Sequence, residues 1–88
     1  MLCRIYRSSL RAEMYLYVPM DRDLTDVPQA LMTSFGDAEE VMILRLTPER
    51  KLARVNVLEV LEALASVGYF LQMPPTPDEL LRRERADG

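Results

Sequence analysis

The side chains best suited to chemistry in this chain are basic and aromatic residues between positions 4 and 54. Ten of the eleven basic residues are arginines, and arginine makes bidentate contacts with phosphate or carboxylate groups. Tyrosine rings interleave with them and could stack on nucleic-acid bases, although tyrosines also pack well within sheets. The candidate interaction surface consists of nine residues: Arg4, Tyr6, Arg7, Tyr15, Tyr17, Arg45, Arg50, Lys51 and Arg54.

The charges are arranged in bands along the chain. Residues 41–54 carry a net charge of +3 and residues 1–20 carry +2, whereas residues 21–40 carry −5 and the whole chain carries −3. This balance excludes a wholly basic nucleic-acid binder. Contact with RNA would require an encounter that keeps the acidic bands away from phosphate.

The composition also excludes most catalytic centres. The chain has no histidine and one cysteine, so it cannot form a histidine-based catalytic triad or a cysteine zinc site. Its three glycines leave no glycine-rich phosphate loop. Carboxylates gather at 21–26 and at 37–40, but the first group lacks the glycine and distal glutamate of an EF-hand. We therefore predict solvated loop charge, no metal, no cofactor and no enzymatic activity.

The lone cysteine and the absence of long apolar segments bear on location. Cys3 alternates within a strand-like segment, and we expect it to be a buried, unreactive residue. A single cysteine suits a reducing compartment. No apolar stretch approaches the roughly 18 residues of a membrane helix, and the first residues lack the layout of a secretory signal. These features predict a cytoplasmic protein that does not bind membranes.

Four segments have the pattern of strands. Residues 2–7 and 14–18 are joined by a short polar connection and predict an antiparallel hairpin. The apolar run 41–46 predicts an interior strand. Residues 69–73 lie between Gly68 and the pair Pro74-Pro75, carry large side chains on both faces, and predict a central strand.

Three segments predict helices. The first is expected to be capped by Thr25 or Asp26, with Pro28 in its first turn, and to end at Gly36. The main helix should begin at Asn56, run to Val67, and pack Val60, Leu61 and Leu64 on the sheet. The last opens at Thr76-Pro77, and residues 82–88 should fray.

Together these elements predict one domain over residues 1–88, of the α+β class. We expect an α/β/α sandwich with about four strands in one sheet and three helices on its two faces.

Several of these segments, in this order, resemble a known family over nearly the whole chain. They are Ile5-Tyr6-Arg7-Ser8-Ser9, Tyr15-Leu16-Tyr17-Val18, Val27-Pro28 with Phe35-Gly36, Met42-Ile43-Leu44, and Gly68 to Pro75 followed by Glu79-Leu80-Leu81. The combination is similar to the YcgL family of small gammaproteobacterial proteins. The resemblance implies a compact α/β/α sandwich, but no reaction and no ligand residues. Genes of the family lie beside that of ribonuclease D in some bacteria, which slightly favours a role connected with RNA.

Two hypotheses of function follow from the sequence. The first is a small cytosolic adaptor that binds another protein and has no catalytic activity. The alternative is an accessory RNA-binding domain, which would use the nine residues named above. If the basic residues converge on one face beside an exposed tyrosine, the RNA hypothesis gains, and if they scatter, it loses.

Overall fold

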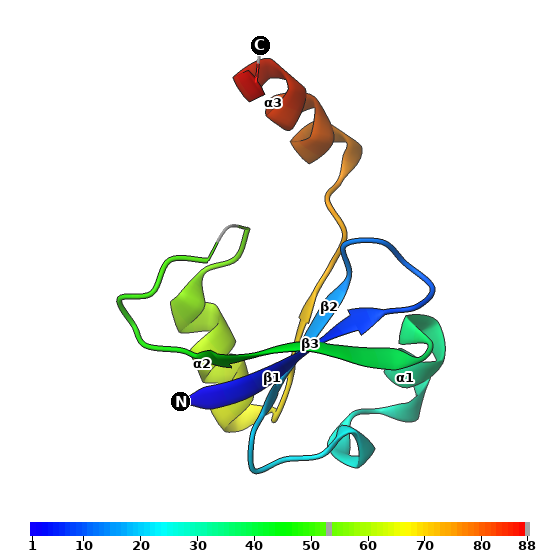
Figure 1. Cartoon of the computed structure of the whole chain (residues 1–88), viewed down its shortest axis with the longest axis vertical. Helices are drawn as coiled ribbons and strands as arrows, with labels where there is room; N and C mark the ends of the chain where they lie inside the picture. The colour runs from blue at the N-terminus through cyan, green and yellow to red at the C-terminus, as the bar shows by residue number, and fades with distance from the viewer. Residues whose placement is uncertain (53, 88) are drawn as a thin grey trace.

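The protein folds around one antiparallel sheet. In the described residues 1–52 and 54–87 of the computed structural model, the sheet has four strands in the order β3-β1-β2-β4 (Figure 1). Side chains beyond Arg82 lie outside that description. The strands are β1 (Leu2–Ser8), β2 (Tyr15–Pro19), β3 (Ala38–Arg45) and β4 (Phe70–Gln72). The helices are the 3₁₀ turn η1 (Leu24–Asp26), α1 (Gln29–Phe35), α2 (Val57–Ser66) and α3 (Pro77–Asp87). The predicted α+β class is confirmed.

The predicted hairpin of β1 and β2 forms the middle of the sheet. The two strands pair antiparallel, with Arg7 opposite Tyr15 at the end nearest the turn. Ser8 closes this turn, because its hydroxyl accepts hydrogen bonds from the backbone amides of Leu10 (3.1 Å) and Arg11 (3.0 Å). The backbone amide of Ser8 donates to the carbonyl oxygen of Met14.

The other two strands lie at the edges of the sheet, which corrects two predictions. The run at 41–46 was expected inside the sheet and the run at 69–73 at its centre. Among the described strands, however, β3 pairs only with β1 and β4 only with β2. Phe70 and Leu71 nevertheless pack on opposite faces, each against a different core cluster. In a sheet covered on both faces, an edge strand carries apolar residues on both sides just as a central one does.

Two hydrophobic cores hold the layers together, one on each face of the sheet. The core beneath α2 contains Cys3, Ile5, Tyr17, Leu46, Val57, Val60 and Leu64. The core beneath α1 contains Met14, Leu16, Val18, Val27 and Phe35. Successive strand residues point to opposite faces, so β2 supplies Tyr17 to one core and Leu16 and Val18 to the other. This arrangement is the expected α/β/α sandwich.

The helix boundaries follow local chemistry. The side chain of Asn56 caps α2 as predicted, accepting from the amide of Leu58 at 2.8 Å. The predicted cap at Thr25 or Asp26 is wrong, because these residues form η1, which Asp23 caps. A residue before proline avoids helical angles, and Val27 is extended, so α1 begins only after Pro28. Gly36, at φ 79°, follows the end of α1 as predicted.

The last helix stands away from the sandwich. Thr76 caps α3 as expected, since its hydroxyl accepts from the amide of Glu79, but the helix projects from the globule instead of lying on a face (Figure 1). Arg54 holds its first turn, with its guanidinium 2.8 Å from the Glu79 carboxylate. The helical backbone runs to Asp87, Gly88 lies outside the described residues, and fraying of 82–88 stays a prediction.

Candidate interaction surface

The nine residues singled out from the sequence are distributed over both faces of the sheet and the segment between β3 and α2. Three share the face covered by α2: Arg7, Tyr15 and Tyr17. Three have strand positions on the face covered by α1: Arg4, Tyr6 and Arg45. The remaining three belong to the segment between β3 and α2: Arg50, Lys51 and Arg54. Of these, Arg54 lines the same groove as Arg7, Tyr15 and Tyr17. The structure therefore does not bring the nine together as one surface.

Three of the arginines have acidic partners. The guanidinium of Arg4 lies 3.1 Å from the carboxylate of Glu40, and that of Arg7 lies 2.6 Å from Glu39. The hydrogen bond to Glu39 raises the pKa of Arg7 above its usual value. On α3, the hydrogen bond from Arg54 lowers the pKa of Glu79. Each pair neutralises a charge that the RNA hypothesis would need for phosphate.

The tyrosines differ in how much of each ring is accessible. Tyr17 is buried, and its hydroxyl donates to the side-chain oxygen of Gln72 at 2.8 Å. Its ring meets Phe70 edge-on, with centroids 5.8 Å apart, and burial raises the pKa of its hydroxyl. Tyr6 is half-buried against the core beneath α1. Tyr15, also half-buried, lines a groove on the α2 face.

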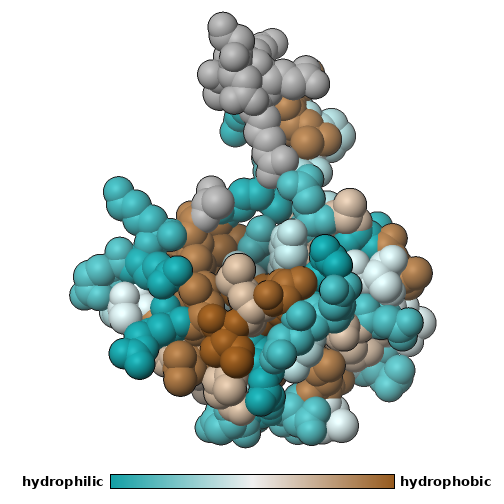
Figure 2. Space-filling model, viewed as in Figure 1, coloured by the Kyte–Doolittle hydropathy of each residue, from teal (hydrophilic) through white to brown (hydrophobic). Residues whose placement is uncertain are grey.

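Helix α2 covers only part of its face of the sheet, and the rest forms this groove. Its volume is about 380 Å³, near the lower end of the range for ligand pockets. Apolar side chains supply most of its lining, and Arg7, Arg54 and Gln72 are its polar members. Figure 2 shows hydrophobic surface gathered near the middle of the molecule, bordered by hydrophilic residues. We define the α2-face groove by its apolar residues Ile5, Tyr15, Tyr17, Val41, Met42 and Leu52.

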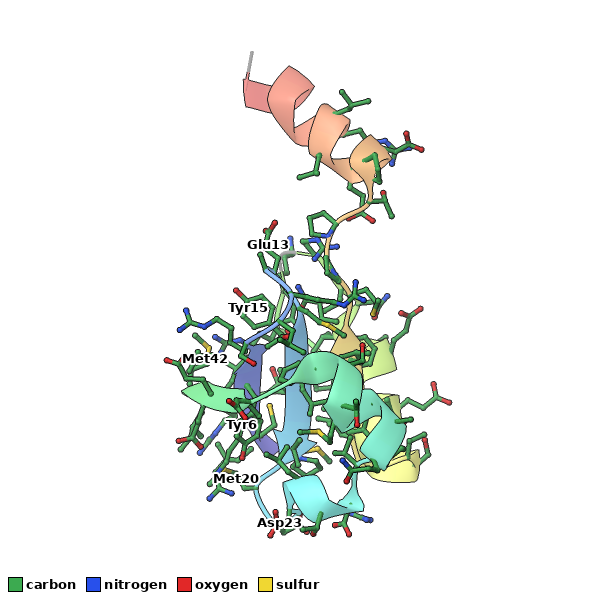
Figure 3. The ribbon with its side chains drawn as sticks, turned by 90° about the vertical axis from the view of Figure 1, so that its right-hand side faces the viewer. Tyr6, Glu13, Tyr15, Met20, Asp23 and Met42 are labelled. Atoms are coloured by element: carbon green, nitrogen blue, oxygen red, sulfur yellow. The ribbon has the colours of Figure 1, made fainter. Side chains whose placement is uncertain are left out.

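The wall of the groove continues onto the outer edge of β3. Val41, Met42 and Ile43 are 39 %, 51 % and 54 % exposed, although they are consecutive apolar residues of a strand. Figure 3, in which Met42 is labelled, shows β3 at the margin of the sheet. Exposed apolar residues that lie together and are bordered by polar ones are typical of interaction sites. We call these three residues the β3 strip.

Sequence reasoning missed the β3 strip because it placed this run inside the sheet. A signal was nonetheless present, since charged residues flank the run on both sides: Glu39 and Glu40 before it, Arg45 after it. Charged side chains on a strand are typical of sheet edges.

The described residues show no arrangement for metal binding, and the thiol is shielded. No group of three or more cysteine or acidic side chains among residues 1–52 and 54–82 is placed to hold a metal ion. Cys3 is buried, its thiol faces the carbonyl oxygen of Leu44 at 3.5 Å, and burial raises its pKa. The positive N-terminus and Arg50 oppose that rise but do not reverse it.

A helix that spans a membrane must be both long and apolar. None of the described helices combines the length and the apolar character needed to cross a bilayer.

The fold and this surface define a class: a small α+β sandwich with an apolar groove on one face and an exposed apolar edge strand beside it. Comparison with known sequences then gives the family. The sequence profile of the YcgL domain matches residues 3–75, so the chain belongs to the YcgL domain family.

Relatives of similar length support the assignment. A YcgL domain-containing protein of Saccharophagus degradans is 47 % identical over 92 % of this chain and 89 % of its own length. A protein named YcgL from Escherichia fergusonii is 46 % identical, over 94 % of this chain and 86 % of its own. A YcgL domain-containing protein of Pseudomonas aeruginosa is 46 % identical, with 92 % of each chain covered.

Proposed function

We propose that this protein is a small, non-catalytic interaction module of the cytosol that binds another protein through the α2-face groove. The observation that carries the proposal is the continuity of the groove with the β3 strip. Met42 and Val41 belong to both, so a partner could bury the groove and the edge of the sheet in one contact. At protein interfaces, the residues that dominate binding energy lie in apolar pockets from which the partner excludes water.

The expected partner segment combines apolar side chains with carboxylates. The groove and the β3 strip need apolar contacts, whereas the end of β3 carries Arg45 and the turn after it carries Arg50 and Lys51. Among the described residues none of these three cations has an acidic partner within ion-pair distance. Complementary charge on a partner would steer the encounter and fix its orientation.

The absence of histidine and the shielding of the thiol support a non-catalytic role. With no imidazole in the sequence, the common general base is missing. Cys3 is buried with a raised pKa, the reverse of what activates a thiolate.

The RNA alternative is less well supported than protein binding. Six of its nine residues divide between the two faces of the sheet, three arginines face glutamates, and Tyr17 is buried. The cations of the turn after β3 are the feature that still favours it.

The proposal is tested by affinity capture from native cytosol with the tagged full-length chain, followed by reconstitution with the purified partner. Met42→Asp should abolish the reconstituted complex, because it introduces a charge at the wall of the groove. Leu10→Asp is the matched control, since Leu10 is 66 % exposed in the turn between β1 and β2. This variant should bind the partner as the unmodified chain does. A partner that binds both variants equally would contradict the proposed surface, and capture of no specific protein would contradict the function itself.

A further inference from the structure

The outer side of β3 offers backbone groups as well as apolar side chains. Among the described strands β3 pairs with β1 alone, so the side away from β1 has no strand neighbour. Exposed edges of this kind can accept an additional strand from another chain. At eight residues, β3 is also longer than β2 or β4.

A bulge divides β3 into two parts. Ile5 pairs with Met42 and Tyr6 with Glu40, so Val41 is an extra residue on β3. From Met42 to Arg45 the register with β1 is regular, and this part is the template for an incoming strand. Met42 lies on the α2 face opposite Ile5, whereas Ile43 lies on the α1 face opposite Arg4. An incoming strand would therefore contact one exposed apolar side chain on each face.

The two ends of β3 differ in charge. At the first end Glu39 and Glu40 are already engaged by Arg7 and Arg4. At the other end Arg45, Arg50 and Lys51 are exposed, and in the described part of the chain they lack acidic partners. The Arg50 side chain donates a hydrogen bond to the carbonyl oxygen of Arg45 at 3.5 Å. The edge is thus positive at the end of the strand and neutralised at its beginning.

From this edge we infer the kind of partner: an extended protein segment that adds to β3 as a further strand, with apolar residues beside Met42 and Ile43 and carboxylates beside Arg45, Arg50 and Lys51. The inference rests on the proposed function and specifies how the partner binds. Main-chain hydrogen bonds to the edge supply part of the affinity in this mode, and the side chains supply the specificity.

A second copy of this chain fits the edge less well. In an antiparallel pair of β3 strands, Glu39 and Glu40 of one copy would approach Arg45 of the other, but those carboxylates already serve Arg7 and Arg4. Each copy would also bring its bulge at Val41 to the contact, and each carries a net charge of −3. The charge at the end of β3 is complementary to an acidic segment from a different protein.

The test selects peptides from a random-peptide display library on the immobilised full-length chain. Enriched peptides should carry β-branched or aromatic residues at adjacent positions, so that one faces Met42 and the next faces Ile43, and aspartate or glutamate at one end. A synthetic peptide of enriched sequence should shift the backbone amide resonances of residues 42–45. Ile43→Asp should lower the affinity for this peptide about tenfold or more, whereas the Leu10→Asp variant should bind the peptide as the unmodified chain does. Ile43 is outside the groove lining, so this variant tests strand addition separately from the groove.

A charge exchange tests the polarity of the site. The double substitution Arg50→Glu and Lys51→Glu should weaken binding of the acidic peptide. A peptide with lysines in place of the acidic residues should bind that variant again. Both residues are exposed, so the variant should fold normally.

Several results would overturn the inference. They are enrichment of no peptides, enrichment of peptides without acidic residues, and binding that Ile43→Asp leaves unchanged. Sedimentation of a dimer that Ile43→Asp dissociates would assign the edge to a second copy, and displacement of the peptide by short single-stranded RNA would assign it to nucleic acid. A captured protein partner that is sensitive to Met42→Asp but not to Ile43→Asp would leave the proposed function standing and remove strand addition. Failure of capture would remove the function as well.

Discussion

The side chain of Ser8 is hydrogen-bonded to the last residue of α1: its hydroxyl donates to the carbonyl oxygen of Phe35 over 2.5 Å. The hydroxyl oxygen of Ser8 also accepts hydrogen bonds from the backbone amides of Leu10 and Arg11. One buried hydroxyl thus joins the end of β1, the hairpin turn and the end of α1. A helix end leaves carbonyl groups without intrahelical partners, and Ser8 satisfies one of them inside the core.

We expect Ser8→Ala to lower the free energy of unfolding by about 1–3 kcal/mol, because it leaves three buried or half-buried backbone groups without their partner. Denaturant melts would measure the change. Ser66→Ala is the control: its hydroxyl donates to Glu62 on the exposed side of α2, and its loss should change stability by less than about 0.5 kcal/mol. Equal effects of the two substitutions would show that the bond to Phe35 contributes little.

The core beneath α2 makes a second prediction. Leu64 is 2 % exposed and packs with Val60 and Tyr17 between helix and sheet. Leu64→Ala should cost about 2–4 kcal/mol through lost burial and the cavity that remains. Leu58, which lies on the same helix but is 58 % exposed, is the matched control, and Leu58→Ala should cost far less in the same melts. A cost below about 0.5 kcal/mol at Leu64 would mean that it is not part of the core.

The parts of the fold that sequence could predict are those determined by local chemistry. The Asn56 cap, the apolar stripe of Val60 and Leu64, and Gly36 after α1 depend on neighbouring residues and occur as expected. The split of η1 from α1 also has a local cause, the extended residue before Pro28, but the capping pattern at Thr25 and Asp26 concealed it.

Strand order and the interaction surface depend on contacts between distant residues. Apolar residues on both faces of β4 indicate helices above and below but not its position in the sheet, since Phe70 and Leu71 reach different cores from the edge. Likewise, the pairing of Arg7 with Glu39 joins residues 32 positions apart. The banded charges therefore predicted a basic surface, whereas the fold neutralises part of it and leaves positive charge mainly after β3.

The buried thiol gives a prediction about reactivity and pH. We expect a thiol reagent to label Cys3 slowly in the native protein and quickly after unfolding, because only the thiolate reacts and burial raises its pKa. Rapid labelling at neutral pH would contradict its burial.

The raised pKa values of Cys3 and Tyr17 also have a consequence for stability. In the unfolded chain these groups ionise near pH 8.5 and about 10, earlier than in the folded state. Their contribution to stability is thus complete below the unfolded values and is lost as pH rises through the folded ones. Denaturant melts from pH 7 upward should show that the free energy of unfolding declines as pH rises. In the Cys3→Ala variant, the decline at the lower pH values should be less steep. An unchanged slope in that variant would exclude Cys3 as a cause.

The ion pairs of three arginines and the burial of Tyr17 give the last prediction, which concerns RNA. We expect no saturable binding of short single-stranded RNA at physiological salt, because Arg4, Arg7 and Arg54 face glutamates and the buried ring of Tyr17 cannot stack on a base. Fluorescence anisotropy at low and physiological salt would measure it. Any binding at low salt should be weak and fall steeply as salt is added, since it would release counterions. Saturable binding at physiological salt that Arg4→Glu with Arg45→Glu abolishes, while the melting temperature stays unchanged, would contradict this expectation and restore the RNA hypothesis.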